Sequence, residues 1–371
     1  MSRLILLLKL VPTILHHGLI MLVQRPLNPE KLSPRLLARL LNVEPSKLEG
    51  YRWEKVHQGT TARWRLYLPA MDSVYFAKTN PPDFATRFFG ALFQLGLNEL
   101  GFYRQIAEHL TIDIPRSYAV MGNRYRYLLL INDLSEQAKF TDVSFRCNLA
   151  QAEAVIDTLA ALHGSCWQQP RFNQQWRWVN RQQYRRNRPF LTMLRQQSSS
   201  AAIKRYQDLL PDNIVEIARL INQCYECLEQ RWGEGERTLV HGDAHIGNMY
   251  FMPDGTVGLL DWQVLGYEQG MRDVTYFIIN SIPGELRRRQ QQYLIERYIA
   301  GLAQSGVGLD IAVALQQYRL HAPYVWVSAA VTAASNTMQE KRIAAAGLIR
   351  ASNAMNDLGM GEFLTSLLTE K

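Results

Sequence analysis

The chain has 371 residues, a net charge of +8 and a pI near 9.3. Apolar residues make up 47% of it and charged residues 20%, which excludes a largely disordered chain. The length allows two modest domains or one large two-lobed enzyme. The basic excess favours anionic partners, such as nucleotides, nucleic acid or anionic lipid, without choosing among them. Four cysteines are too few for a dense disulfide framework, so we expect a cytoplasmic protein.

The first 23 residues are rich in Leu and Ile but also contain Lys9, Pro12 and two histidines. A membrane-spanning helix needs about 20 apolar residues with few charges. A signal peptide needs a small-residue cleavage site, which is not evident here. We therefore expect residues 1–23 to form a helix that docks on the protein or lies peripherally at a membrane surface. A second, short helix is expected next, where Ser33 can cap it and Pro34 suits its first turn.

Residues 51–131 are rich in short runs of aromatic and β-branched residues, and the chain after residue 148 has mostly helical periodicity. The pattern predicts an α+β fold with two lobes, a small β-rich N-lobe and a large, mostly helical C-lobe. We expect an N-terminal helical extension over 1–47, the N-lobe over 48–135 and the C-lobe over 136–371. Within these bounds the expected strands are 51–57, 62–68, 73–78 and 124–131, and the clearest helices are 86–110, 150–163 and 212–232.

Residues 240–262 form the most informative segment. Pro253-Asp254-Gly255 lies between two apolar runs, and this composition predicts a tight turn that joins an antiparallel hairpin. If Met252 faces Val257 across a four-residue loop, Asn248 faces Asp261 at the open end of the hairpin. A three-residue loop would shift the pairing by one position and still leave the two residues close.

This pairing has a chemical use. An amide oxygen from Asn248 and a carboxylate from Asp261 are oxygen ligands of the kind that Mg²⁺ prefers. Asp243 lies five residues before Asn248 and can orient an acceptor hydroxyl and take its proton. The spacing D-x4-N, followed by an aspartate one hairpin later, is the pattern of a kinase catalytic loop and its metal aspartate. Asp261 also interrupts an apolar strand, where a buried carboxylate would be costly without a partner or metal.

The motif His241-Gly242-Asp243-x4-Asn248 with Leu260-Asp261-Trp262 resembles the aminoglycoside phosphotransferase and choline kinase superfamily, which has a protein-kinase-like fold. Further features resemble its ecdysteroid kinase-like branch and the bacterial members of that branch. These features are the E-x-x-F-Y helix at 99–103, the strand lysine in Tyr75-Phe76-Ala77-Lys78, the hinge at 128–134 and the helix end Leu162-His163-Gly164. The resemblance extends over roughly residues 30–360.

The resemblance implies an ATP-dependent, Mg²⁺-dependent small-molecule kinase. Lys78 would hold the nucleotide phosphates and pair with Glu99, while Asp243 would be the catalytic base. By the same resemblance, Asn248 and Asp261 would bind the metal, and Asp273 would brace the catalytic loop. The phosphates would be covered by Gly59, Thr60 and Thr61. Adenine would be contacted by backbone groups of Asn132 and Leu134. The chain departs from the family pattern in two places: the phosphate turn has one glycine, and the hinge has Asn132-Asp133 where the branch usually has Glu-Asp.

Three other functions are compatible with parts of the sequence. His241, Asp243 and His245 could hold a metal in a hydrolase, although the remaining histidines show no paired spacing. Residues 171–195 combine seven arginines with aromatic residues that include Phe172, Trp176, Trp178 and Tyr184, as single-strand nucleic-acid binders do, but packed aromatics explain the pattern better. A protein kinase is disfavoured because no A-P-E motif follows Asp261. The favoured partner is a small hydroxyl acceptor, with no obligate protein partner evident and with Trp262, Tyr267, Tyr324 and Trp326 as candidate pocket residues.

Overall fold

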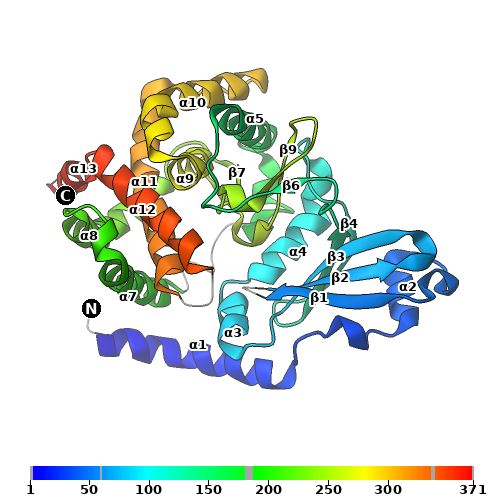
Figure 1. Cartoon of the computed structure of the whole chain (residues 1–371). Helices are drawn as coiled ribbons and strands as arrows, with labels where there is room; N and C mark the ends of the chain where they lie inside the picture. The colour runs from blue at the N-terminus through cyan, green and yellow to red at the C-terminus, as the bar shows by residue number, and fades with distance from the viewer. Residues whose placement is uncertain (1–2, 59–60, 180–186, 336–338, 370–371) are drawn as a thin grey trace.

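The computed structural model describes residues 3–58, 61–179, 187–335 and 339–369. Its elements are arranged as a sheet-based lobe and a larger helical lobe, with a long N-terminal helix along one edge of both (Figure 1). This arrangement confirms the predicted α+β fold with a β-rich N-lobe and a helical C-lobe.

The N-lobe is an antiparallel sheet whose five strands have the spatial order β1-β2-β3-β5-β4. Alternation along the strands gives the sheet two different faces. Leu66 and Leu130 pack with Leu37 of helix α2 (Pro34–Leu41) on one face, whereas Arg63 and Lys78, cross-strand partners, lie on the other. The strands are β1 (Arg52–Gln58), β2 (Ala62–Leu68), β3 (Ser73–Thr79), β4 (Ser117–Gly122) and β5 (Tyr127–Asn132).

One helix expected at 86–110 is two helices in the structure, α3 (Phe84–Leu92) and α4 (Leu95–Gln105). Gln94 has a left-handed backbone conformation with φ +58°, which ends the first helix and redirects the second. Asp83 caps α3 by accepting a 2.7 Å hydrogen bond from the backbone N–H of Thr86. The break separates α4 from α3 and lets α4 pack against the segment that begins at Trp262.

The C-lobe is built around α9 (Met271–Ser281), a helix whose residues are all buried. Helix α11 packs against α9, α7 and α12, and α10 packs against α5. The remaining helices are α5 (Leu149–Cys166), α7 (Arg188–Tyr206), α8 (Ile214–Trp232), α10 (Gly284–Gln304), α11 (Ile311–Ala334), α12 (Lys341–Asp357) and α13 (Met360–Thr369). Short strands hold the loops on the cleft side: β6 (Lys139–Phe140), β7 (Thr238–Val240), β8 (Met249–Phe251), β9 (Val257–Leu259) and β10 (Gly266–Glu268).

The expected hairpin is present as β8 and β9, but its register corrects the four-residue-loop prediction by one position. Phe251 pairs with Val257, and the N–H of Met252 donates to the carbonyl of Thr256 at 2.9 Å. The loop is therefore the three residues Pro253-Asp254-Gly255, with Gly255 at φ +89°, as three-residue hairpin loops require. Asn248 consequently faces Leu260, whose N–H donates to the Asn248 carbonyl at 2.8 Å, and not Asp261.

The described aromatic residues of the arginine-rich segment 171–195 pack on the protein. Phe172 is buried and stacks on Tyr267 with ring centroids 4.1 Å apart. Trp176 and Trp178 donate their indole N–H groups to the carbonyl and the side-chain oxygen of Gln105. These contacts support the packing interpretation over an exposed stacking platform for nucleic acid. Tyr184 and three of the seven arginines lie outside the described residues.

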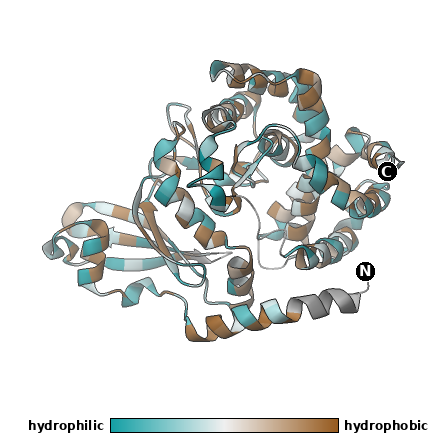
Figure 2. Cartoon of the chain, turned by 180° about the vertical axis from the view of Figure 1, so that it is seen from behind, coloured by the Kyte–Doolittle hydropathy of each residue, from teal (hydrophilic) through white to brown (hydrophobic). Residues whose placement is uncertain are grey.

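The N-terminal helix α1 (Arg3–Val23) docks against α3 and α7. His17 shares a 2.7 Å hydrogen bond with the hydroxyl of Tyr125, and Arg87 donates to the carbonyl of Gln24 at 2.6 Å. Figure 2 shows the helix lying under both lobes, with hydrophobic residues along much of its described length. Within the described residues, no helix combines the length and apolar character needed to cross a membrane.

Candidate active site

The loop after β7 is held from beneath by the carboxylate of Asp273, which is fully buried at the start of α9. The backbone N–H groups of His241 and Gly242 donate to its two oxygens at 2.6 and 2.8 Å. Gly242 has φ +82°, a conformation that glycine adopts without strain. The direction of the loop is thus fixed by backbone hydrogen bonds to one charged acceptor.

A second layer of buried polar groups supports Asp273. His163, in the last turn of α5, lies with Nε2 3.2 Å from an Asp273 oxygen and Nδ1 2.8 Å from the hydroxyl of Tyr298. Burial acts to raise the pKa of Asp273, but His163 and the backbone donors outweigh it and hold that pKa below its ordinary value. Asp273 therefore stays ionised, as its role as a triple acceptor requires.

Asp243 lies at the tip of this loop. Asn248 donates its amide N–H to both the backbone carbonyl and a carboxylate oxygen of Asp243, at 2.9 and 3.1 Å. His245 Nε2 is 3.6 Å from the same oxygen. Burial acts to raise the pKa of Asp243, but the charge and hydrogen bonding of His245 outweigh it and hold the pKa well below its ordinary value. So acidic a carboxylate suits orienting a hydroxyl and accepting its proton late in a transfer.

The two loop histidines use their rings to hold the loop. His241 accepts from the N–H of Asp243 at Nδ1 (3.3 Å), and its Nε2 lies 2.6 Å from the carbonyl of Leu260. His245 accepts from the N–H of Gly247 at Nδ1 (3.0 Å), which leaves Nε2 as the nitrogen that carries a proton toward Asp243. Within the described ranges, no three His, Cys, Asp or Glu residues are placed to hold a metal together. The hydrolase alternative therefore lacks the ligand set that it needs.

Asp261 follows β9 and has an unusual backbone conformation, with φ +66°. Its carboxylate lies 3.3 Å from Lys78 Nζ and 3.8 Å from an Arg63 nitrogen. Burial acts to raise the pKa of Asp261, whereas Lys78 and then Arg63 lower it, and the net direction is downward. Oδ1 is buried and has the ionic contact with Lys78 but no hydrogen bond of good geometry. Strain of this kind at a buried carboxylate is typical of functional sites.

Helix α4 contacts both Lys78 and residues 262–263, which follow Asp261. Glu99 accepts from Lys78 Nζ at 2.7 Å, and burial raises the pKa of Glu99 against the opposing charge of Lys78. Asn98 donates to the carbonyl of Gln263 at 2.9 Å, and Phe102 stacks flat on Trp262 at 3.9 Å. The predicted partners Lys78 and Glu99 are therefore brought together beside Asp261.

Arg63 was missed by the sequence analysis. It is the cross-strand partner of Lys78, its side chain is 35% exposed, and its Nε is buried without a hydrogen-bond partner. The signal was available in the strand Ala62–Leu68, where the apolar residues at alternate positions leave Arg63 and Arg65 on one face. Arg65 donates to a carboxylate oxygen of Asp133 at 2.7 Å and so ties β2 to the hinge.

The structure describes only part of the residues predicted to contact adenine and the phosphates. The Asn132 N–H donates to the carbonyl of Arg116, and the Leu134 carbonyl accepts from Gln137 and Ala138. The Asn132 N–H and the Leu134 carbonyl are thus already occupied by hydrogen bonds within the protein. Thr61 is buried, and its hydroxyl has no hydrogen-bond partner. Gly59 and Thr60 lie outside the described residues.

Two oxygen atoms fit the expected magnesium ion. Asn248 uses its amide nitrogen for Asp243, so its amide oxygen is the atom that can ligate a cation. The Oδ1 of Asp261 is a buried acceptor with unused hydrogen-bonding capacity. An amide and a carboxylate oxygen are suitable Mg²⁺ ligands when phosphates and water complete the coordination shell.

Of the four aromatic residues considered as pocket residues, two contact the catalytic loop: Tyr324, and Trp262, whose ring centroid lies 4.8 Å from that of His241. Tyr324 donates its hydroxyl to the carbonyl of Gly242 at 2.8 Å. Trp262 and Trp326 are fully buried, and Tyr267 stacks on Phe172. The sequence analysis did not select Tyr276, whose ring lies near Tyr324 and His245 and whose hydroxyl interacts with Asp243 and Ser328.

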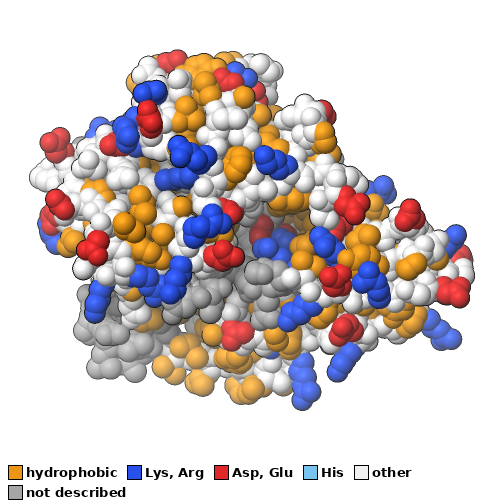
Figure 3. Space-filling model, in the orientation of Figure 1, with side chains coloured by type: hydrophobic (Ala, Val, Ile, Leu, Met, Phe, Trp, Pro, Cys, Tyr) orange, Lys and Arg blue, Asp and Glu red, His pale blue; other side chains and the backbone are white. Residues whose placement is uncertain are grey.

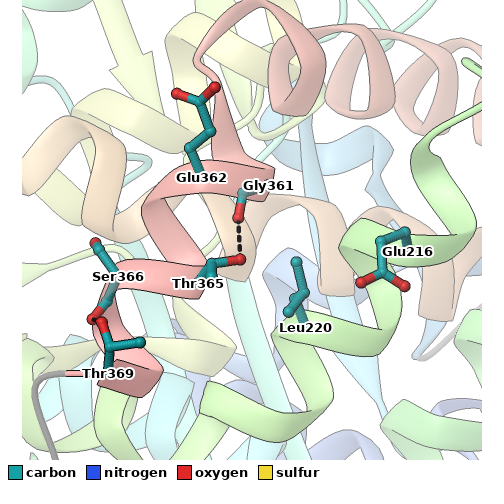
Figure 4. A pocket seen from close by; sticks show the side chains of 7 residues that line it. All are labelled: Glu216, Leu220, Gly361, Glu362, Thr365, Ser366 and Thr369. Atoms are coloured by element: carbon teal, nitrogen blue, oxygen red, sulfur yellow. Dashed lines mark hydrogen bonds between the residues drawn. The ribbon is translucent and has the colours of Figure 1, made fainter.

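The surface is hollowed between the lobes, and charged side chains of both signs lie in the recess (Figure 3). A second hollow, of about 600 Å³, lies between α8 and α13 and has none of these site residues in its lining (Figure 4). It is a shallow, open groove lined by Glu216, Leu220, Gly361, Glu362, Thr365, Ser366 and Thr369. We assign no ligand to it, because its lining contains no convergent set of polar groups.

The fold and this site define a small-molecule kinase of the phosphotransferase type. The chain belongs to the ecdysteroid kinase-like family, whose model matches residues 71–308. A comparison with curated protein sequences found no significant match.

Solved structures show the same fold at low sequence identity. An ethanolamine kinase from Plasmodium vivax aligns with a TM-score of 0.51 and 11% identity, over 84% of this chain and 83% of the other. A Ralstonia eutropha protein assigned to the aminoglycoside phosphotransferases aligns with a TM-score of 0.50 and 16% identity, over 90% and 98%. These likenesses confirm the protein-kinase-like fold predicted from the sequence.

Proposed function

We propose that this protein transfers the γ-phosphoryl group of ATP to a hydroxyl of a small organic acceptor, with Mg²⁺ bound by Asn248 and Asp261. The proposal is carried by two features that lie close together. Asp243 is ionised and hydrogen-bonded to Asn248, and the ion pair of Lys78 with Asp261 lies nearby. Hydroxyl activation, metal ligation and phosphate binding all need charged groups in one cleft, and these residues supply them.

Each side chain has a defined part in the proposed transfer. Asp243 accepts a hydrogen bond from the acceptor hydroxyl and takes its proton as the oxygen attacks the γ-phosphorus. The bond from that phosphorus to the β–γ bridging oxygen breaks, and ADP leaves. Lys78 and Arg63 offset phosphate charge, while a bound magnesium ion would supply further charge neutralisation. Thr61, together with Gly59 and Thr60, would cover the phosphates, and Asn132 and Leu134 would hold adenine.

The two lobes divide this work in the proposal. Residues 48–135 bind the nucleotide, and residues 136–371 carry the catalytic loop and the acceptor site. Tyr276, Tyr324 and Ser328 lie around the loop and can contact an acceptor by ring faces and hydroxyl groups. We expect the reaction to run in a reducing compartment such as the cytoplasm, because none of the four cysteines forms a disulfide and three are buried.

The test is an ATP-consumption screen over amino alcohols, sugars, sterols and other alcohols, with a protein substrate as one member of the panel. Once an acceptor is found, Asp243→Ala should lower turnover by roughly 10²–10⁴-fold, about 3–5 kcal/mol of barrier. Asp254→Asn is the matched control, since Asp254 is an exposed turn carboxylate where asparagine is well tolerated. Undiminished turnover in Asp243→Ala would contradict the proposed base.

The metal assignment is tested separately by calorimetry. Asp261→Ala should lose binding of Mg·ATP, because the carboxylate proposed to ligate the metal is gone. Unchanged affinity and unchanged turnover in this variant would remove Asp261 from the metal site. Phosphorylation of the protein substrate, with no alcohol accepted, would favour a protein kinase.

A further inference from the structure

Helix α1 carries a continuous apolar stripe on its outward side. Leu15, Leu19 and Leu22 are 59%, 64% and 72% exposed, and Val23 is 84% exposed. Val11 and Ile14 extend the stripe toward the N-terminus, at 46% and 45% exposure. These six residues, called the α1 stripe below, recur at helical spacing on one side of the helix. They are a concentrated group of exposed large apolar side chains on one element.

The opposite side of α1 accounts for its attachment to the protein. Met21 is buried with Ala91 and Tyr125, and His17 is buried and hydrogen-bonded to Tyr125. The helix is therefore held in place by its inner side, while the α1 stripe is left outward. A contiguous exposed apolar surface of this kind usually marks an interaction site, whereas apolar residues that are exposed singly need no explanation.

Charge near the stripe indicates what it contacts. The first acidic residue of the chain is Glu30, so residues 1–29 carry basic side chains with no acidic counterpart. Arg25, immediately after the helix, is exposed, as are Lys31 and Arg35 in the next segments. Figure 3 shows apolar side chains along this lower edge of the molecule, with basic side chains projecting beside them. An apolar stripe flanked by basic groups is complementary to an anionic bilayer surface.

We propose that the α1 stripe inserts into the surface of an anionic bilayer, with Arg25, Lys31 and Arg35 against the lipid headgroups. A bilayer suits this surface because a convex helix ridge needs no shape-matched groove to enter lipid. α1 lies parallel to the edge of the molecule under both lobes, so the protein would rest on the bilayer along its side (Figure 1). This inference does not depend on the proposed reaction.

The test uses the full-length protein and co-sedimentation with vesicles of phosphatidylcholine, with or without phosphatidylglycerol. Wild-type protein should bind the anionic vesicles, bind neutral vesicles more weakly, and lose affinity as salt is raised. The variant Leu15→Glu/Leu19→Glu/Leu22→Glu should lose about tenfold or more in vesicle affinity, because three exposed apolar side chains that would insert into the bilayer become charged.

A control variant tests whether the effect depends on where the new charges are placed. Leu209→Glu/Val215→Glu/Val313→Glu adds the same charge at apolar residues that are 56%, 62% and 41% exposed elsewhere. It should bind anionic vesicles like the wild type, and both triple variants should keep the wild-type thermal unfolding midpoint. Absent binding by the wild type, or equal losses in both variants, would overturn the proposal. So would a wild-type dimer that the α1 variant alone converts to monomer, which would make the stripe an interface between copies.

Discussion

The two walls of the cleft are built differently. On the C-lobe side, the buried Asp273 accepts short hydrogen bonds from backbone N–H groups of the catalytic loop, at 2.6 and 2.8 Å. On the N-lobe side, Asp261 is approached by the ends of two long side chains, Lys78 at 3.3 Å and Arg63 at 3.8 Å. One wall is positioned through backbone groups and the other through side-chain cations.

This difference suggests that the C-lobe wall holds the catalytic loop rigidly, whereas the N-lobe wall can adapt when a nucleotide binds. A loop fixed through its backbone holds Asp243 in one orientation, which proton transfer requires. Long side chains can exchange a carboxylate for phosphate oxygens when a nucleotide arrives, at little structural cost. Substitutions on the C-lobe wall should therefore affect folding and turnover, whereas substitutions on the N-lobe wall should mainly change nucleotide affinity.

The largest expected effect is that of Asp273→Asn. All three partners of Asp273 donate to it, so the new amide would turn an N–H toward another donor and leave polar groups buried without partners. We expect the free energy of unfolding to fall by roughly 3–5 kcal/mol, measured by denaturant titration. Asp254→Asn, at the exposed turn, should stay within about 0.5 kcal/mol of the wild type. Equal stability of both variants would show that the C-lobe wall is not held through Asp273.

A smaller effect is expected from His245→Gln and concerns pH. His245 interactions outweigh burial and hold the pKa of Asp243 below its ordinary value, so removing them should raise that pKa. A base acts when deprotonated, so the acid limb of kcat/KM should move to higher pH by about one unit, about 1.4 kcal/mol, with little change above neutrality. His16→Gln, at an exposed histidine, is the control. An acid limb that stays in place, or moves to lower pH, would contradict the proposed coupling.

The smallest effect tests the N-lobe wall. Arg63→Gln should raise the KM for Mg·ATP roughly fivefold, about 1 kcal/mol for a partly exposed charge, and change kcat less. Arg52→Gln is a matched control, because Arg52 is a largely exposed arginine on the neighbouring strand. A large loss of kcat at unchanged KM would place Arg63 in transition-state stabilisation and so weaken the contrast between the walls.

Much of the fold and of the site could be predicted because the signals are local. Runs of aromatic and β-branched residues predicted the first three strands, and the spacing of Asp243, Asn248 and Asp261 depends on one hairpin. The hairpin register was not predictable to the residue, because Pro253-Asp254-Gly255 fits loops of three or four residues. The positive φ of Gly255 and the Met252–Thr256 hydrogen bond select the shorter loop in the structure.

Other features depend on contacts between distant segments. Strand β4 was missed because Ser117–Gly122 is a short edge strand whose pairing with β5 has no strong pattern of its own. The break at Gln94 carries neither glycine nor proline and became visible only through its backbone conformation. Tyr276 reaches Asp243 because α9 packs beside the loop, which no spacing within α9 could show. The individual roles of the site residues remain predictions.

Gly101 of α4 packs against Trp178 and affects the position of residues that it does not contact. A Cβ at this position would lie 2.6 Å from the ring of Trp178, so only glycine lets that ring lie against the helix. The same helix carries Phe102 against Trp262, next to Asp261. A bulkier residue at 101 would therefore displace either Trp178 or α4, and a displaced α4 would shift Asp261, the proposed metal ligand, without touching it. The packing of the arginine-rich segment 171–195 and the geometry proposed for phosphoryl transfer therefore both depend on the position of α4.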